Sequence, residues 1–180
     1  YYQRNVKGKE HALHCRKKGH LDAPEQVLLD LNAVAAAHKF AALGPSDVSP
    51  SGRYFAYALD KTGFRQYELR VRDLETNVEL SERAERVTSV AFANDEKTLF
   101  YSIEDPVAKR SHRVYRHKIG EASDKDVLVF EEKDERFEVE VRRTRSRGYM
   151  VILSESHTAN EARLISADRP NEAPRVVVPR

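Results

Sequence analysis

Three stretches of the sequence decide the fold: SPSGRYFAY at residues 49–57, ANDEKTLFY at 93–101 and RSRGYMVI at 145–152. Each begins with a polar turn rich in Pro, Gly, Asn, Asp or Ser and continues into a run of aromatic, aliphatic and β-branched residues. This order is typical of a hairpin turn that leads into a buried strand. The stretches recur at intervals of roughly 45 to 50 residues, a period found in propeller blades. The repeat therefore predicts a series of similar sheets.

The apolar residues are distributed differently in different strands of each repeat. Residues 54–59 and 150–153 are apolar on both faces, as expected of strands covered on both sides. Residues 67–72 and 137–142 alternate between apolar and charged side chains, which is typical of half-buried strands. We therefore predict four strands per repeat. These lie at 46–49, 53–59, 66–72 and 78–80, then at 88–92, 98–103, 112–118 and 127–131, and finally at 137–142, 148–154, 161–167 and 175–178.

The residues before the first repeat predict part of an earlier blade and one helix. Residues 1–5, 11–16 and 26–31 have the pattern of three strands of a blade that lacks its first strand. Residues 32–42 are the only helical candidate, with Asn32 as N-cap, an alanine-rich body and Gly44 just after its end.

Together these patterns predict an all-β partial propeller with one short helix. It contains about three complete four-stranded blades plus part of an earlier one. The predicted units are 1–31 as the partial blade, 32–45 as the helical connection, and 46–84, 85–134 and 135–180 as one blade each. A two-sheet sandwich is the alternative, because short alternating strands alone do not separate the two folds.

Composition narrows the class of protein. The 180 residues carry 31 basic and 29 acidic side chains, a net charge of +2, which argues against a nucleic-acid surface. The longest apolar run is 33–37, too short for a membrane helix, and no signal peptide opens the chain. A lone Cys15 cannot form an internal disulfide and is typical of a reducing compartment, which predicts a cytoplasmic location. Because the chain begins at Tyr1 and ends in the strand-like run 175–180, we expect a fragment of a longer protein.

Six further stretches carry a resemblance to a known family. They are VLLDLN at 27–32, YELRVRDLET at 67–76, AND at 93–95 followed by LFY at 99–101, VYRHKIG at 114–120, VLVFEEKD at 127–134 and EARLISAD at 161–168. None is a catalytic signature, but they follow one another across nearly the full length. In them the chain resembles the propeller of oligopeptidase B, a branch of the prolyl oligopeptidase family of serine peptidases.

The resemblance implies a function for the whole protein. Members of this branch place a seven-bladed propeller over an α/β-hydrolase domain that cleaves short peptides after Arg or Lys, and the propeller restricts access to it. This chain would supply about half of the ring. Its expected partners are the hydrolase domain of the same parent chain and short peptides, with no nucleic acid, membrane, cofactor or metal. The alternative is a propeller that serves as a binding scaffold without enzymatic activity.

No residue of the chain is predicted to be catalytic. The closest approach to the Gly-x-Ser-x-Gly nucleophile motif is 44–48, around Ser46, which lacks the last glycine. His117 and His157 have no nucleophile or partnered carboxylate that the sequence places beside them. We therefore expect the chain alone to be inactive.

The remaining polar clusters have structural interpretations. His11, His14, Cys15 and His20 are the densest set of metal-ligand types, but a three-residue spacing in an extended strand sends His11 and His14 to opposite faces. The basic run Arg142, Arg143, Arg145 and Arg147 follows closely on acidic residues, and it reads as a solvated hairpin turn or as a contact with the hydrolase domain. Aspartates near strand ends are expected to accept hydrogen bonds from turn amides: Asp47, Asp60, Asp73, Asp95 and Asp105.

Overall fold

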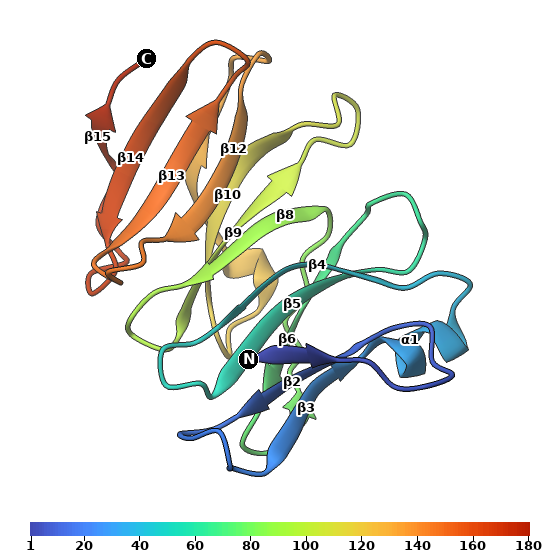
Figure 1. The fold of residues 1–180 in the computed structure, drawn as a ribbon. Helices are drawn as coiled ribbons and strands as arrows, with labels where there is room; N and C mark the ends of the chain where they lie inside the picture. The colour runs from blue at the N-terminus through green and yellow to red at the C-terminus, as the bar shows by residue number, and fades with distance from the viewer.

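The computed structural model describes all 180 residues as four antiparallel sheets that follow one another along the chain (Figure 1). The first contains β1 (Tyr2–Arg4), β2 (Leu13–Lys17) and β3 (Glu25–Asp30). The second contains β4 (Ala42–Val48), β5 (Tyr54–Asp60), β6 (Glu68–Asp73) and β7 (Val78–Glu79). The third contains β8 (Val87–Phe92), β9 (Thr98–Glu104), β10 (Ser111–Lys118) and β11 (Val127–Glu131). The fourth contains β12 (Glu138–Arg143), β13 (Tyr149–Glu155), β14 (Asn160–Ser166) and β15 (Arg175–Val178).

The sheets are arranged as successive blades of a propeller. In the second, third and fourth sheets the strands are paired in chain order, and the first strands β4, β8 and β12 lie next to one another. Two hydrogen bonds join these inner strands: Phe92 N donates to Asp47 Oδ2 at 2.8 Å, and Val141 N donates to Ser89 Oγ at 2.9 Å. Four sheets stacked side by side confirm the partial propeller and exclude the two-sheet sandwich.

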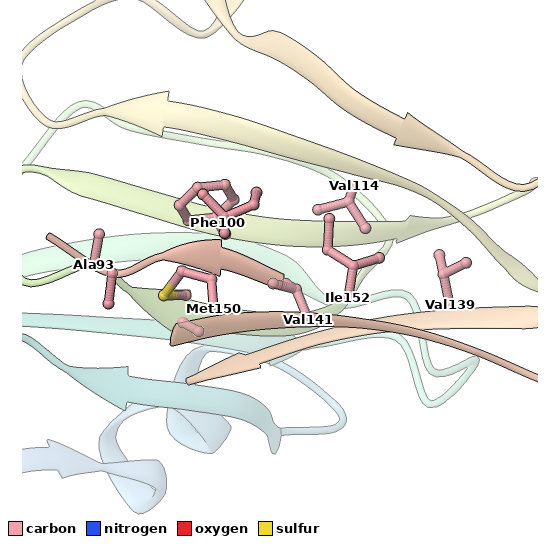
Figure 2. Packing of buried hydrophobic residues seen from close by; sticks show 10 residues of the cluster. Ala93, Phe100, Val114, Val139, Val141, Met150 and Ile152 are labelled. Carbon is pink, nitrogen blue, oxygen red and sulfur yellow. The ribbon is translucent and has the colours of Figure 1, made fainter. Parts of the chain in front are cut away.

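Apolar side chains fill the space between neighbouring sheets. Figure 2 shows Phe100 and Val114 from the third sheet pointing toward Val141, Met150 and Ile152 from the fourth. All five are at most 2% exposed. Similar clusters lie between the second and third sheets and between the first and second. Full burial of a large apolar side chain contributes about 1.5–3 kcal/mol, so these layers are the main source of stability.

The helix differs from its predicted bounds. The helix α1 spans Leu31–Ala37, and its N-cap is Asp30, whose Oδ1 accepts a hydrogen bond from Asn32 N at 2.8 Å. The predicted N-cap Asn32 is therefore wrong. The helix also ends well before residue 42, because the chain is already extended at its C-cap, His38. A 3₁₀ turn, η1 (Ser123–Lys125), was not predicted. Neither helix is long and apolar enough to span a bilayer.

Gly44 lies inside β4 instead of closing the helix. A Cβ atom at this position would come 2.4 Å from Cδ1 of Tyr67, well inside contact distance. Tyr67 is itself partly buried and packs against the buried apolar cluster between the second and third sheets. Glycine is therefore required here by close packing, and its interpretation as a helix stop is wrong.

A buried charge cluster joins the second and third sheets. His117 on β10 lies with Nδ1 2.6 Å from Asp126 Oδ1 and Nε2 4.0 Å from Glu82 Oε1. Tyr101 donates from its hydroxyl to Asp126 Oδ2 at 2.7 Å, and Gly120 N donates to Glu82 Oε1 at 2.7 Å. Burial alone lowers the pKa of His117, but Asp126 and Glu82 outweigh burial and raise this pKa to about 9. The histidine is therefore protonated at neutral pH.

The packing at Gly44 leads to a first prediction. Replacing Gly44 with Ala should lower the free energy of unfolding by about 1–3 kcal/mol, because the Tyr67 ring must move to admit a methyl group. Gly148→Ala is the control, since a Cβ there meets only Ser146 Oγ at 3.6 Å. Urea unfolding of both variants measures the difference, and equal effects would contradict the steric explanation.

The charge cluster makes stability depend on pH. The pKa of His117 is raised from 6.5 to about 9, so the folded state holds a proton that the unfolded chain loses first. Its stabilising contribution is complete below pH 6.5 and declines as the pH rises to about 9. His117→Gln should lower stability and remove this slope. The exposed His157→Gln should leave the slope intact, and urea midpoints measured from pH 6 to pH 9.5 test both expectations.

Because the outer face of the fourth sheet is apolar, we expect copies of this chain to associate with one another. Tyr149, Val151 and Leu153 point away from the core on β13 and remain partly exposed, whereas the residues between them are buried. An uncovered apolar sheet face favours contact with another copy. Val151→Lys should therefore shift sedimentation velocity profiles toward monomer, whereas Val107→Lys, at a position 88% exposed in a loop, should not. A monomer at every concentration before substitution would contradict the expectation.

Candidate functional site

Three hairpin turns lie along one edge of the row of sheets, each between the first and second strands of a sheet (Figure 1). At equivalent positions of these turns, Gly52, Glu96 and Arg147 have φ values of 79°, 66° and 60°. Ser51 donates from N and Oγ to the two carboxylate oxygens of Glu96, both at 2.6 Å. Asn94 Nδ2 donates to the carbonyl of Arg147 at 2.8 Å. Neighbouring sheets are thus linked at the turns as well as along their inner strands.

A groove of about 530 Å³ lies against this edge. Its walls come from the first sheet, from β4 and β5, and from the turn that follows β12. Apolar and aromatic side chains such as Tyr1, Leu28 and Phe55 form part of the wall. The charged lining residues are Asp47, Arg143 and Arg147, with His14 as a further titratable group. The groove therefore combines an apolar surface with a small number of charged groups.

Asp47 is the acidic residue that lines the groove, and both oxygens of its carboxylate accept hydrogen bonds from backbone amides. Its Oδ1 accepts from Val48 N at 2.9 Å and its Oδ2 from Phe92 N at 2.8 Å, which ties β4 to β8. Burial raises the pKa of Asp47 above its ordinary value, and this effect outweighs the lowering by the Phe92 amide and the nearby Arg143. The prediction that Asp47 accepts hydrogen bonds from turn amides is wrong. Its carboxylate instead links the second sheet to the third.

The other aspartates near strand ends accept turn amides as predicted. Asp60 accepts from Arg65 N at 2.7 Å, Asp73 from Glu75 N at 2.9 Å, Asp95 from Thr98 N at 2.8 Å, and Asp105 from Val107 N at 2.8 Å. These carboxylates fix the loops between strands.

The basic run divides into paired and unpaired arginines. Arg142 lies 3.6 Å from Glu140 Oε1. Arg143 has no acidic partner, and its Nη1 reaches only Asn94 Oδ1 at 3.5 Å. Arg147 likewise has no ion pair, while Arg145 lies on the same turn outside the groove. The four arginines therefore differ in their surroundings: Arg142 is ion-paired, whereas Arg143 and Arg147 line the groove without an ion pair.

The remaining candidates are placed apart from one another. Ser46 lies within β4 and borders the groove, in a strand and not at a strand-to-helix elbow. His14 and Cys15 lie on β2, and His11 precedes that strand, so the argument from opposite strand faces does not apply to His11. His20 lies in the exposed turn after β2. No three His, Cys, Asp or Glu side chains converge as they would around a metal ion.

The partners of His117 were missed by sequence reasoning, which found no carboxylate for this ring. The structure supplies Asp126 and Glu82, both nearly buried. They lie in loops outside the periodic strands, and nothing in their spacing indicates the contact. The hydroxyl that joins this cluster belongs to Tyr101, which donates to Asp126.

Comparison with known proteins agrees with this architecture. The family described as "Prolyl oligopeptidase, N-terminal beta-propeller domain" matches residues 1–180. Dipeptidyl aminopeptidase BI of Pseudoxanthomonas mexicana is 34% identical over 189 residues, which cover 94% of this chain and 26% of that protein. Protease 2 of Moraxella lacunata is 29% identical, with 94% of this chain and 26% of that protein covered. The chain thus spans about a quarter of the length of these relatives.

Two solved structures of oligopeptidase B have the same fold over this region. The protein from Leishmania major aligns with a TM-score of 0.88 and 24% identity, covering 99% of this chain and 26% of that chain. The closed form from Trypanosoma brucei, solved with covalently bound antipain, aligns with a TM-score of 0.83 and 27% identity, again over 99% of this chain and 26% of that chain. These alignments confirm the resemblance to the oligopeptidase B propeller. With a family match over all 180 residues, the chain belongs to the prolyl oligopeptidase family, as part of its N-terminal β-propeller domain.

Proposed function

We propose that this chain forms part of a propeller that admits short peptides to a serine peptidase active site, and that the peptidase cleaves after Arg or Lys. The observation that carries the proposal is the side-by-side placement of β4, β8 and β12. In a propeller these inner strands border the central channel. Such a channel limits passage to chains that are narrow and flexible, so folded proteins are excluded.

The chemistry of the proposed whole enzyme is acyl transfer to water. A serine hydroxyl attacks the peptide carbonyl, a histidine takes and returns the proton, and backbone amides stabilise the oxyanion. In this chain the one hydrogen-bonded histidine ring, His117, contacts Asp126 and no serine. The proposal assigns the catalytic groups to a hydrolase domain outside these residues.

The names of the relatives favour this proposal over a binding scaffold, because both proteins compared above are named as peptidases. A cytoplasmic location belongs to the same proposal. Its support is compositional: the single Cys15 is free and buried.

Activity measurements test the proposal at two levels. The 180-residue chain should not hydrolyse an arginyl peptide substrate, whereas the complete peptidase that contains it should cleave short Arg and Lys peptides and spare long or folded chains. Glu96→Ala removes both contacts to Ser51 and so loosens two sheets at their inner edge. We expect the ratio of kcat/KM for a long peptide to that for a short one to rise about tenfold, the scale of one lost charge-assisted contact.

Glu121→Ala is the matched control, because this exposed carboxylate forms an ion pair only with Lys118, three residues earlier at the end of β10. It should leave the ratio unchanged. Hydrolysis by the isolated chain would place catalysis within it and contradict the proposal. Equal cleavage of short and long substrates by the unmodified peptidase would contradict the gating role.

A further inference from the structure

The row of sheets has two edges, and different connections form them. The turn edge consists of the turns between the first and second strands: 49–53, 93–97 and 144–148. The loop edge consists of the loops between the second and third strands: 61–67, 105–110 and 156–159. These edges are opposite one another, because successive connections of an antiparallel sheet alternate between its two ends. Figure 1 shows the turns on the left of the view and the first two loops on the right.

Large apolar side chains project from the loop edge. Phe64 is 78% exposed in the loop after β5, and Val107 is 88% exposed in the loop after β9. Both loops belong to complete four-stranded sheets. Phe40, which is 42% exposed, lies beside the first loop, since a Cβ atom at Gly63 would come 3.7 Å from its ring. None of the exposed large apolar side chains lies in the turns of the turn edge. Exposed apolar groups gathered at one edge indicate contact with another surface.

An aspartate holds each of these two loops in one conformation. Asp60 accepts hydrogen bonds from Thr62 N at 2.8 Å and from Arg65 N at 2.7 Å. Asp105 accepts from Val107 N at 2.8 Å. The apolar tips therefore have fixed positions, and little conformational entropy is lost when a partner covers them.

Unpaired positive charges accompany the apolar tips. Lys61, Arg65 and Lys109 lie on the same two loops, and none of them takes part in an ion pair. Asp105 is the only acidic residue of the three loops, and its carboxylate accepts turn amides. The loop edge therefore carries a net positive charge, which is complementary to an acidic surface.

The size of the relatives indicates what kind of partner covers the loop edge. The chain spans 26% of each of the two peptidases and of each of the two oligopeptidase B chains compared above, so the greater part of those proteins lies outside the matched region. The tips belong to two successive sheets, and only a broad surface covers both at once. A folded domain has such a surface, whereas a single short peptide does not.

We propose that the hydrolase domain of the same protein docks on the loop edge, through an acidic surface whose apolar part covers Phe64 and Val107. The inference rests on the proposed function for one premise, that such a domain belongs to the protein. It places Arg145 and Arg147 on the opposite edge, away from the hydrolase domain. The first strands β4, β8 and β12 then run from the hydrolase domain toward the turn edge, and peptides enter the channel from the turn edge.

Acetylation of lysines in the complete peptidase tests the proposal. Lys109 on the loop edge and Lys97 on the turn edge are both exposed in this chain. Each acetylation rate is measured by mass spectrometry and divided by the rate for the same lysine in the urea-unfolded peptidase. We expect Lys109 to react about tenfold more slowly than Lys97, which corresponds to a docked state populated at about 90%.

Variants of the complete peptidase assign the protection to named residues. Phe64→Ser and Val107→Ser should each make Lys109 react several-fold faster, and the two positions keep the test decisive if one variant does not fold. Arg65→Glu should act in the same direction, because it brings a negative charge to an acidic surface. Arg145→Glu is the matched control, since it makes the same charge reversal on the turn edge. It should leave the rate at Lys109 unchanged.

Three results would overturn the inference. Equal normalised rates at Lys97 and Lys109, or slower acetylation of Lys97, would show that the hydrolase domain does not select the loop edge. Equal effects of Arg65→Glu and Arg145→Glu would reduce the charge contribution to overall charge. Protection that disappears when the peptidase is diluted would assign the edge to a second copy of the protein. Because acetylation involves no substrate, its failure is distinguishable from a failure of gating, which is read from substrate length.

Discussion

Every sheet of this chain depends on neighbouring sheets to cover its faces. The strand β5 illustrates the constraint, because alternate residues enter different cores: Ala56 and Ala58 face the third sheet, whereas Phe55 and Tyr57 face the first. The strand β9 divides its residues in the same way between the second and fourth sheets. A sheet with two apolar faces has no stable solvated form on its own. Blade order, burial and the position of the inner strands all follow from this requirement.

Polar contacts fix the alignment of neighbouring sheets, which apolar packing alone does not determine. Hydrophobic burial scales with area and does not distinguish among many ways of stacking two sheets. The hydrogen bonds from Phe92 to Asp47 and from Val141 to Ser89 hold the inner strands at one register, and the Ser51–Glu96 contact does the same for the turns. Further out, His117 anchors the third sheet to the loop that carries Glu82. The groove exists because these links bring three separate sheets to one edge.

The sequence allowed the repeated strands to be predicted, because their signal is local: a polar turn followed by an apolar run. The bounds of α1 were predicted less well, since Asn32 and Asp30 are both good caps and only the bend of the chain at His38 ends the helix. Gly44 resembles a helix stop until the position of the Tyr67 ring is known. The groove and the partners of His117 could not be predicted at all. Asp126 is only nine positions from His117 but lies in a loop outside the repeated strands, Glu82 belongs to a different loop, and no periodic pattern connects Tyr1 with Arg147.

The outermost strands are shorter or more exposed to solvent than the strands near the centre. The strand β15 is exposed at all four of its residues, and β7 is only two residues long, whereas β5 is buried along nearly its entire length. Evolutionary drift should therefore be fastest at the rim, where a changed side chain meets water, and slowest toward the hub. Because solvent exposure increases from the hub to the rim, the rim is the natural place to attach an affinity tag or a fluorescent label.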